Sequence, residues 1–362
     1  MKFFKGVDFF PHGTTWKIIS WRYLFVGMSW ALAVLSAILL VTRGLNYGVD
    51  FKGGSLIEVQ AKAGTLDVGD LRSKLNALGL GEVQVQGVGV TGQEALIRIA
   101  QQKGSKEVNE DKAQSLANEK VKASLGDAVS IRRTEVVGPT VSAELKRTGV
   151  IAVIAAMAGI MLYLWFRFEW QFAIAGIVAL VHDVFITTGM FSLLWYEFDL
   201  ATVAALLTLA GYSINDTVVV FDRIRENLRK YKKMPLEQLL DLSINETLSR
   251  TVLTSSVTAL AVLALYLFGT EAIHGFSFAM LFGIVIGTYS SIFVAAPLLL
   301  FFGVKRDWSG VKEAAGKPAA ATGQTGVKAV AGKPAVAPLD KADKTPAAKD
   351  KSGKNTPAAG RA

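Results

Sequence analysis

The stretch LATVAALLTLAGYSINDTVVVF, residues 200–221, is apolar along most of its length, yet it carries an aspartate at position 216. A helix needs roughly 20 predominantly apolar residues to span the hydrocarbon core of a bilayer. A charged side chain within such a span is costly and is typical of a site that faces a cavity or a partner. This stretch therefore predicts a membrane helix with a functional carboxylate.

Five further stretches are long and apolar enough to cross a membrane. The chain has 362 residues, of which 51% are hydrophobic and 19% charged, with a mean hydropathy of +0.37. Charged and apolar residues must therefore be segregated along the chain. The five other predicted spans are approximately Tyr23–Thr42, Val150–Phe166, Phe172–Trp195, Thr251–Phe268 and Phe276–Phe302.

Lysine and arginine occur in every second loop between these spans. The segment before the first span has four basic residues, the loop after the second has Arg167, and the loop after the fourth has six between positions 223 and 233. The loops at 196–199 and 269–275 contain neither Lys nor Arg. Because short loops rich in Lys and Arg stay in the cytoplasm, both chain termini are expected there.

Residues 43–147, between the first two spans, have the composition of a soluble domain, with 15 basic and 13 acidic residues. Alternating and helical apolar patterns predict strand, helix, two strands, helix and strand in that order. This is the βαββαβ order of a ferredoxin-like domain, which the orientation places in the periplasm. The predicted elements are Ser55–Ala61, Val68–Leu80, Glu82–Val88, Ala95–Ala100, Glu107–Leu125 (with Leu116, Val121 and Leu125 on its apolar side) and Val129–Val137.

Polar and ionisable residues occur inside three of the spans. His182 and Asp183 lie near the middle of the third, Asn215 and Asp216 lie in the fourth, and Arg250 opens the fifth. Adjacent antiparallel helices would let Asp216 and Arg250 meet at similar depth. Burial disfavours a charged carboxylate and a nearby cation favours it, so Asp216 is expected to bind and release a proton near neutral pH. We therefore predict proton coupling, with protons as the coupling ion and no cofactor.

Other interpretations of these residues remain open. Arg250 could extend its side chain to the lipid headgroups, as long basic side chains do near helix ends. Asp183 could make only an interhelical hydrogen bond. A structural role is less favoured for Asp216, because polar residues surround it. The stretch Pro235–Thr247, before the fifth span, predicts an amphipathic helix on the cytoplasmic surface.

The C-terminal residues 303–362 predict a disordered, basic cytoplasmic tail. They hold 12 Lys or Arg and 5 Asp or Glu, and therefore most of the net charge of +9. No aromatic residue follows Trp308 that could stack on bases, so nucleic-acid binding is not expected. The chain also has no cysteine, three histidines and no phosphate-binding GxxxxGK[ST] loop, which disfavours thiol, zinc and nucleotide chemistry. A protein without enzymatic activity is expected.

Four stretches resemble one known family: NYGVDFKGGSLIEV at 46–59, VGPTVSAEL at 137–145, VHD at 181–183 and AGYSINDTVVVFDRIREN at 210–227. They are similar to the smaller member of the SecD/SecF family of bacterial protein export, which belongs to the resistance-nodulation-division (RND) superfamily. The resemblance covers about residues 1–308. It implies a membrane α-helical bundle of six transmembrane helices, half of an RND-type transporter, with the periplasmic domain between helices 1 and 2. The expected segments are 1–22 (cytoplasmic), 23–42 (helix 1), 43–147 (periplasmic domain), 148–302 (helices 2–6) and 303–362 (tail).

The same resemblance implies partners and residue roles. It implies a complex with SecD in the inner membrane that uses the proton motive force to complete preprotein export, after SecA and the SecYEG channel have begun it. YajC is a further implied partner, and the unfolded preprotein is the substrate. Asp216 and Arg250 match the proton-coupling motifs, His182 and Asp183 match a polar pair, and Asn215 lies within the first motif. Asp50, Gly53 and Gly54 would form a hinge at the membrane junction, where glycine tolerates unusual backbone angles.

Two other functions fit the membrane topology. One is an RND-type, proton-driven transporter of a small hydrophobic solute, which the single small external domain disfavours. The other is a passive scaffold for Sec components, which has little need of the intramembrane Asp216.

Overall fold

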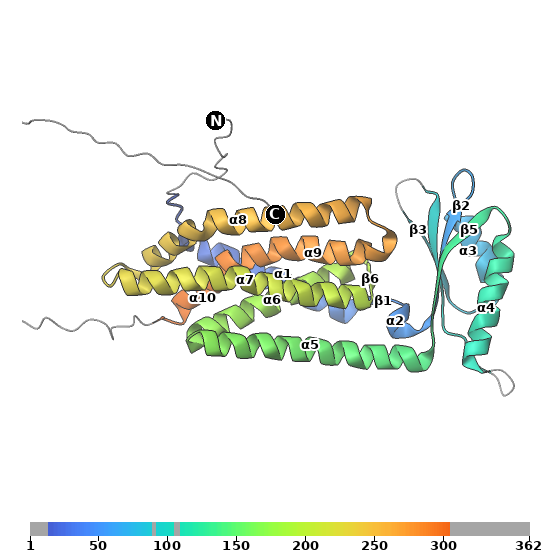
Figure 1. Cartoon of the computed structure of the whole chain (residues 1–362), viewed down its shortest axis with the longest axis horizontal. Coiled ribbons are helices and arrows are strands. Elements are labelled where there is room, and N and C mark those ends of the chain that lie inside the picture. The colour runs from blue at the N-terminus through green and yellow to red at the C-terminus, as the bar shows by residue number, and fades with distance from the viewer. Residues whose placement is uncertain (1–13, 89–91, 105–108, 305–362) are drawn as a thin grey trace, which may run out of the picture. The chain divides into compact units, whose positions relative to one another are not determined.

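The computed structural model describes residues 14–88, 92–104 and 109–304 (Figure 1). The predicted tail, apart from residues 303 and 304, and the start of the N-terminal segment lie outside the described residues.

Six helices in the described part of the chain are long and apolar enough to span a membrane, which confirms the predicted number. Short elements extend the first and the last. The bundle consists of η1 (Ile19–Trp21) with α1 (Arg22–Thr42), α5 (Pro139–Arg167), α6 (Trp170–Leu194), α7 (Leu200–Lys230), α8 (Leu236–Phe268), and α9 (Glu271–Ser290) with the π-helix η2 (Ser291–Ala295) and α10 (Ala296–Phe301).

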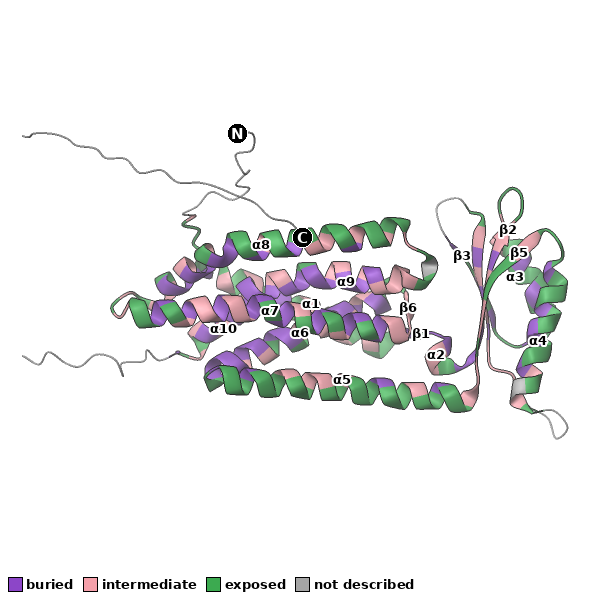
Figure 2. Cartoon of the chain, viewed as in Figure 1, coloured by how far each residue is buried: buried purple, intermediate pink, exposed green. Residues whose placement is uncertain are grey.

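The helices of the bundle divide into an inner and an outer set (Figure 2). Buried residues are concentrated in α6, α7 and the segment from α9 to α10, whereas large apolar side chains of α1, α5 and α8 are exposed. Glycines let the inner helices α7 and α9 approach closely: Gly283 lies against Leu209, and Gly287 lies against Ser213. Apolar side chains that face outward are stable when lipid surrounds them, so this pattern fits a membrane protein.

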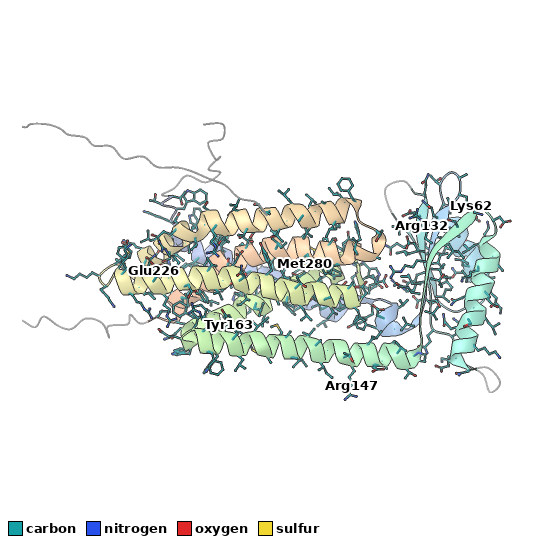
Figure 3. The ribbon with its side chains drawn as sticks, viewed as in Figure 1. Lys62, Arg132, Arg147, Tyr163, Glu226 and Met280 are labelled. Atoms are coloured by element: carbon teal, nitrogen blue, oxygen red, sulfur yellow. The ribbon has the colours of Figure 1, made fainter. Side chains whose placement is uncertain are left out.

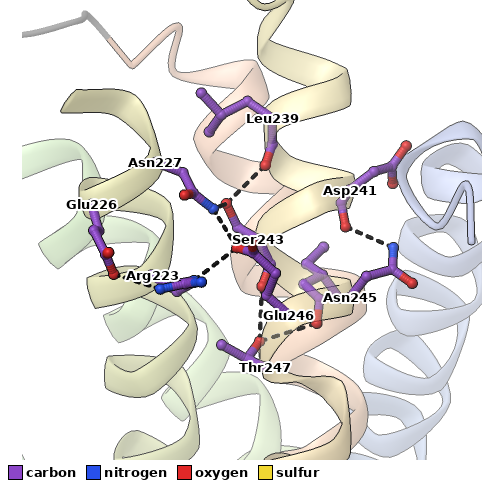
Figure 4. Close-up of polar contacts among 10 residues, drawn as sticks. Arg223, Glu226, Asn227, Leu239, Asp241, Ser243, Asn245, Glu246 and Thr247 are labelled. Carbon is purple, nitrogen blue, oxygen red and sulfur yellow. Dashed lines mark hydrogen bonds and ion pairs between the residues drawn. The ribbon is translucent and has the colours of Figure 1, made fainter. Parts of the chain in front are cut away.

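The stretch Pro235–Thr247 is helical as predicted, but its predicted place on the membrane surface was wrong, because it is the first part of α8, a continuous helix of 33 residues. Leu239, Leu240 and Ile244 are buried within the bundle instead of lying on its surface. Polar contacts also join this part of α8 to α7 (Figure 4). Asn227 donates to Ser243 at 3.0 Å and to Glu246 at 2.7 Å, and the stretch therefore extends the bundle beyond the apolar span.

Residues 54–137, called the insert below, have the predicted order of strands and helices. Their four strands pair antiparallel throughout in the order β3-β4-β2-β5, which is the ferredoxin-like arrangement. The elements are β2 (Gly54–Ala61), α3 (Val68–Asn76), β3 (Val83–Val88), β4 (Glu94–Ile99), α4 (Glu110–Leu125) and β5 (Val129–Val137).

One face of this sheet packs against α3 and α4. Leu75 and Val121 are fully buried against Ile57 and Ile97 of the central strands. The apolar side of α4 was predicted incorrectly in one position: Leu116 is 47% exposed, and Ala117 is buried in its place. Asp67 begins α3 as its N-cap, since its carboxylate accepts from two backbone N–H groups of the first turn.

A small junction connects the insert to the bundle at the position expected for the hinge residues, and its strand pairing was not predicted. Strand β1 (Asn46–Tyr47) pairs in parallel with β6 (Glu197–Phe198), which lies between α6 and α7. The one-turn helix α2 (Val49–Lys52) follows β1 and packs near the start of α5. This junction marks what we call the insert end of the bundle, and the α7–α8 connection marks the opposite, hairpin end.

Candidate functional site

Asp216 lies in the middle of α7, among helices that bury it almost completely. It is 3% exposed, and its Oδ2 accepts a hydrogen bond from the Ser255 hydroxyl of α8 at 3.2 Å. The Tyr212 hydroxyl lies 3.5 Å from the same serine oxygen, too far for a strong bond. One hydroxyl donor is few for a buried carboxylate, which has about four lone-pair sites.

A chain of hydroxyl contacts continues from Ser255 to α9, and either protonation state of Asp216 sets the direction of its hydrogen bonds. Ser255 Oγ lies 2.7 Å from Thr288 Oγ1 of α9, which in turn lies 2.8 Å from the Ile284 carbonyl oxygen. With an ionised carboxylate, Ser255 donates to Asp216, and Thr288 donates to Ser255 or to the carbonyl. With a protonated carboxyl, Asp216 donates to Ser255, Ser255 donates to Thr288, and Thr288 donates to the carbonyl.

The predicted direct pairing of Arg250 with Asp216 is not present. Arg250 lies on α8, within electrostatic range of Asp216, but its exposed side chain makes no ion pair or hydrogen bond with the described residues. Its backbone carbonyl accepts from Thr254. The hydroxyl of Ser255, five positions further along α8, donates to the Asp216 carboxylate instead. The two charged groups thus lie on neighbouring helices without direct contact.

Asn215 is the sequence neighbour of Asp216, but its side chain has different surroundings. Consecutive helical residues point about 100° apart, and Asn215 is exposed on α7, whereas Asp216 faces α8 and α9. The structure therefore does not bring Asn215 to the carboxylate, and its predicted role stays a prediction.

Asp183 of α6 has a more complete set of partners. It is fully buried, and its Oδ2 accepts from Ser213 of α7 at 2.5 Å and from Ser290 at the end of α9 at 2.7 Å. Its Oδ1 lies 2.9 Å from Nδ1 of His182, so the sequence neighbours are also spatial partners. Asp183 therefore has three potential donors, and the hydroxyl of Ser290 also lies 3.1 Å from the Gly287 carbonyl oxygen.

The two carboxylate sites share helices. Ser213 and Asp216 lie one turn apart on α7, and Thr288 and Ser290 lie two positions apart on α9. The π-helix η2 begins directly after Ser290. A π-helical turn is a rare departure from α-helical bonding that is frequent at functional sites. Any movement of α7 against α9 would therefore affect both carboxylates.

The residues predicted as a hinge lie at the junction. Asp50 accepts from the backbone N–H of Leu200 at 3.0 Å and so connects α2 to the start of α7. Gly53 and Gly54 have φ angles of +73° and +114°, which side chains other than glycine rarely adopt. A side chain at Gly54 would also collide with the Ile99 carbonyl of β4. The glycines are thus required for the turn into β2, and a hinge movement there stays a prediction.

Sequence reasoning missed the acidic part of this junction. Glu197 of β6 forms an ion pair with Arg98 of β4, and Asp199 caps α7 by accepting from the Thr202 backbone at 2.7 Å. Burial raises the pKa of Glu197 more than Arg98 lowers it, and burial also raises the pKa of Asp199. The loop 196–199 has no basic residue but has two acidic ones, Glu197 and Asp199, and these were the signal available for this site.

Two family models match the chain. Residues 117–305 match the C-terminal region of the protein export membrane protein SecD/SecF, and residues 38–64 match the SecD/SecF GG motif. The chain belongs to the SecD/SecF family. This confirms the resemblance drawn from the sequence, and the family consists of export accessory proteins rather than enzymes.

Individual relatives support the same assignment. The chain is 45% identical over 306 residues to the protein translocase subunit SecF of Rhodobacter capsulatus, and the match covers 82% of the chain and 92% of the relative. It is 46% identical to SecDF of Brucella abortus but spans only 37% of that longer protein. The crystal structure of SecDF from Thermus thermophilus matches 83% of the chain with a TM-score of 0.72 at 37% identity, and the match covers 40% of that structure.

Proposed function

We propose that the chain is an auxiliary subunit of the Sec protein translocase, and that it uses the proton motive force together with SecD to complete preprotein export. Export would begin with SecA and the SecYEG channel, and the unfolded preprotein would be the substrate. SecD as a partner is supported by the longer SecDF relatives, of which this chain covers 37% and 40%. SecYEG and YajC are proposed from family membership.

One observation carries the proposal: Asp216 is buried inside the bundle, and a single hydroxyl, that of Ser255, reaches its carboxylate. When Asp216 is protonated, its Oδ2 would donate a hydrogen bond to Ser255 Oγ. Ser255 would then donate to Thr288 of α9. Loss of the proton leaves a negative charge with one hydroxyl donor, at 3.2 Å, in a nearly closed space. The two states of Asp216 therefore favour different arrangements of α7, α8 and α9.

The side chain of Arg250 would move toward Asp216 or away from it as the charge of Asp216 changes. An ionised Asp216 attracts the guanidinium on the neighbouring helix, and a protonated Asp216 does not. Moving one charge through a potential of about 100 mV yields about 2.3 kcal/mol, and each pH unit adds about 1.4 kcal/mol. A few protons could thus drive a modest displacement of α8 and, through α7 and β6, of the insert.

We further propose that the protein lies in the bacterial inner membrane with both termini in the cytoplasm and the insert in the periplasm. The basic α7–α8 hairpin supports this orientation. A cysteine introduced at Gly104 should react with a membrane-impermeant reagent added to whole cells. A cysteine at Lys232 should react only after the membrane is opened, and labelling in the reverse pattern would contradict the orientation.

The mechanism is tested with Asp216→Asn, which keeps the shape of the side chain and removes its titratable proton. Preprotein import into inverted membrane vesicles is measured with and without a proton uncoupler, at matched protein levels. Import driven by ATP alone should continue, whereas its enhancement by the proton gradient should disappear. Arg250→Met should cause a similar loss, because no cation on α8 would then be attracted when Asp216 becomes charged.

Two control variants make this test specific. Asp222→Asn is the same substitution on α7, but Asp222 pairs with Arg167 at the hairpin end, so sensitivity to the uncoupler should remain. Asp183→Asn should lower protein abundance without removing gradient dependence from the protein that remains. If Asp216→Asn vesicles keep full sensitivity, Asp216 is structural and the proposed mechanism is wrong.

A further inference from the structure

A basic pocket lies at the hairpin end of the bundle, away from the carboxylates in its interior. It has a volume of about 550 Å³ and is lined by the corner between α5 and α6 and by the last turns of α7. Glu226, labelled in Figure 3, marks this end of α7. The lining residues are Arg167, Asp222, Arg225, Glu226, Arg229 and Lys230.

Both acidic side chains of the pocket already have cationic partners. Asp222 accepts two hydrogen bonds from Arg167, at 2.6 and 2.7 Å. Glu226 accepts from Arg223 at 2.7 Å, on the side facing α8 (Figure 4). The positive charges of Arg225, Arg229 and Lys230 therefore have no carboxylate of the pocket left to neutralise them.

These three cations are only weakly engaged by the protein. Arg225 reaches the Arg167 carbonyl at 3.4 Å, and its Nε is buried without a partner among the described residues. Arg229 makes no hydrogen bond or ion pair with any residue that the structure describes. Lys230 lies over the Tyr231 ring at 5.0 Å. Several N–H donors thus remain for an anion.

Exposed aromatic side chains place this pocket at the level of the lipid headgroups. The α5–α6 corner carries Trp165, Phe166 and Trp170, which are 60%, 81% and 52% exposed and flank Arg167 in the sequence. Exposed tryptophans at the ends of membrane helices sit at the interface between hydrocarbon and water. Basic pockets at this depth on the cytoplasmic side of membrane proteins bind anionic lipid headgroups.

We propose that this pocket binds the phosphate group of an anionic phospholipid, held by Arg225, Arg229 and Lys230. Arginine suits this role because its planar guanidinium donates two parallel hydrogen bonds to phosphate oxygens. The acyl chains would lie along the apolar outer surface of α5, beside Trp165. Such a lipid would fix the last turns of α7 to the α5–α6 corner.

The test compares two double substitutions in the full chain, purified in detergent and stripped of lipid. Arg225→Gln/Arg229→Gln changes the pocket, whereas Lys232→Gln/Lys233→Gln removes the same charge from the hairpin loop outside it. Native mass spectrometry records the binding of dioleoyl phosphatidylglycerol, with dioleoyl phosphatidylcholine and soluble glycerol 3-phosphate as further probes. Gel filtration and circular dichroism confirm that each variant is folded.

The unmodified chain should bind phosphatidylglycerol in preference to phosphatidylcholine, and glycerol 3-phosphate should not compete at equal concentration. Removing two basic charges at the interface should weaken the first phosphatidylglycerol bound by about tenfold or more, and the loop variant should change it little. Equal weakening by both variants would show diffuse attraction and overturn the pocket. Absence of a preference for phosphatidylglycerol would also overturn the proposal and leave an acidic protein partner as the alternative.

Discussion

Asp183 and Asp216 are both buried carboxylates on neighbouring inner helices, but they differ in the number of hydrogen-bond donors that reach them. Asp183 has three potential donors, from α6, α7 and α9. Asp216 has one hydroxyl donor, Ser255, at 3.2 Å. The first arrangement suits a fixed joint between helices, and the second suits a group that gains and loses a proton.

The largest expected effect is the loss of stability in Asp183→Asn. The amide offers one oxygen where the carboxylate had two, and its NH₂ group would face a donor from Ser213, Ser290 or His182. Loss of charge-assisted bonds and a buried unpaired donor should cost roughly 2–4 kcal/mol. The measurement is the thermal unfolding of the purified full chain in detergent.

Val181→Ala, a substitution at an exposed position on the same helix, is the control and should change stability little. If Asp183→Asn unfolds at the temperature of the control, the three contacts do not hold the helices together. The carboxylate would then have the same freedom as Asp216, and the comparison would fail.

The same substitution at Asp216 should have a much smaller effect. Asparagine can donate from its amide to Ser255, as a protonated carboxyl does, so the chain to Thr288 stays complete. We expect the free energy of unfolding to change by no more than about 1 kcal/mol. The thermal unfolding measured for Asp183→Asn serves here too, and a loss as large as at Asp183 would show that Asp216 is normally ionised.

The difference between the two carboxylates could not be predicted from the sequence. The six spans and the intramembrane positions of His182, Asp183 and Asp216 follow from apolar runs interrupted by polar residues. The serines and threonines that distinguish the sites come from other helices, at 213, 255, 288 and 290. Which hydroxyl reaches which carboxylate depends on helix rotation, which a hydropathy pattern leaves undetermined.

Similar reasons explain the errors elsewhere. Local patterns predicted the insert because the apolar residues of each of its strands and helices recur with the period of that type of element. The β1–β6 ladder joins two-residue strands that lie about 150 residues apart, and so short a strand has no period to detect. The pairing of Arg250 was predicted from depth alone, and depth does not exclude a competing partner such as Ser255. The stretch Pro235–Thr247 has an apolar side, but α7 covers it where membrane surface was expected.

The smallest expected effect concerns the junction, where a third type of carboxylate site occurs. Glu197 has one cation, Arg98, on another element, and its side chain is 24% exposed. Burial raises the pKa of Glu197 and of Asp199, and the nearby Asp50 adds repulsion to the latter. Each group therefore binds a proton more readily in the folded junction than in the unfolded chain.

The stability that these two groups contribute is fully present below their unfolded pKa values of about 4.3 and 3.9, and it is lost as pH rises through the higher folded values. Amide hydrogen exchange of β1 and β6, corrected for the intrinsic rate, should thus show less protection at about pH 8 than at about pH 5. Glu197→Gln should flatten this dependence. Asp70→Asn, at the exposed pair with Lys74, should leave it unchanged. Protection that increases with pH would mean that the ion pair with Arg98 outweighs burial, and the junction would then be a fixed joint like Asp183.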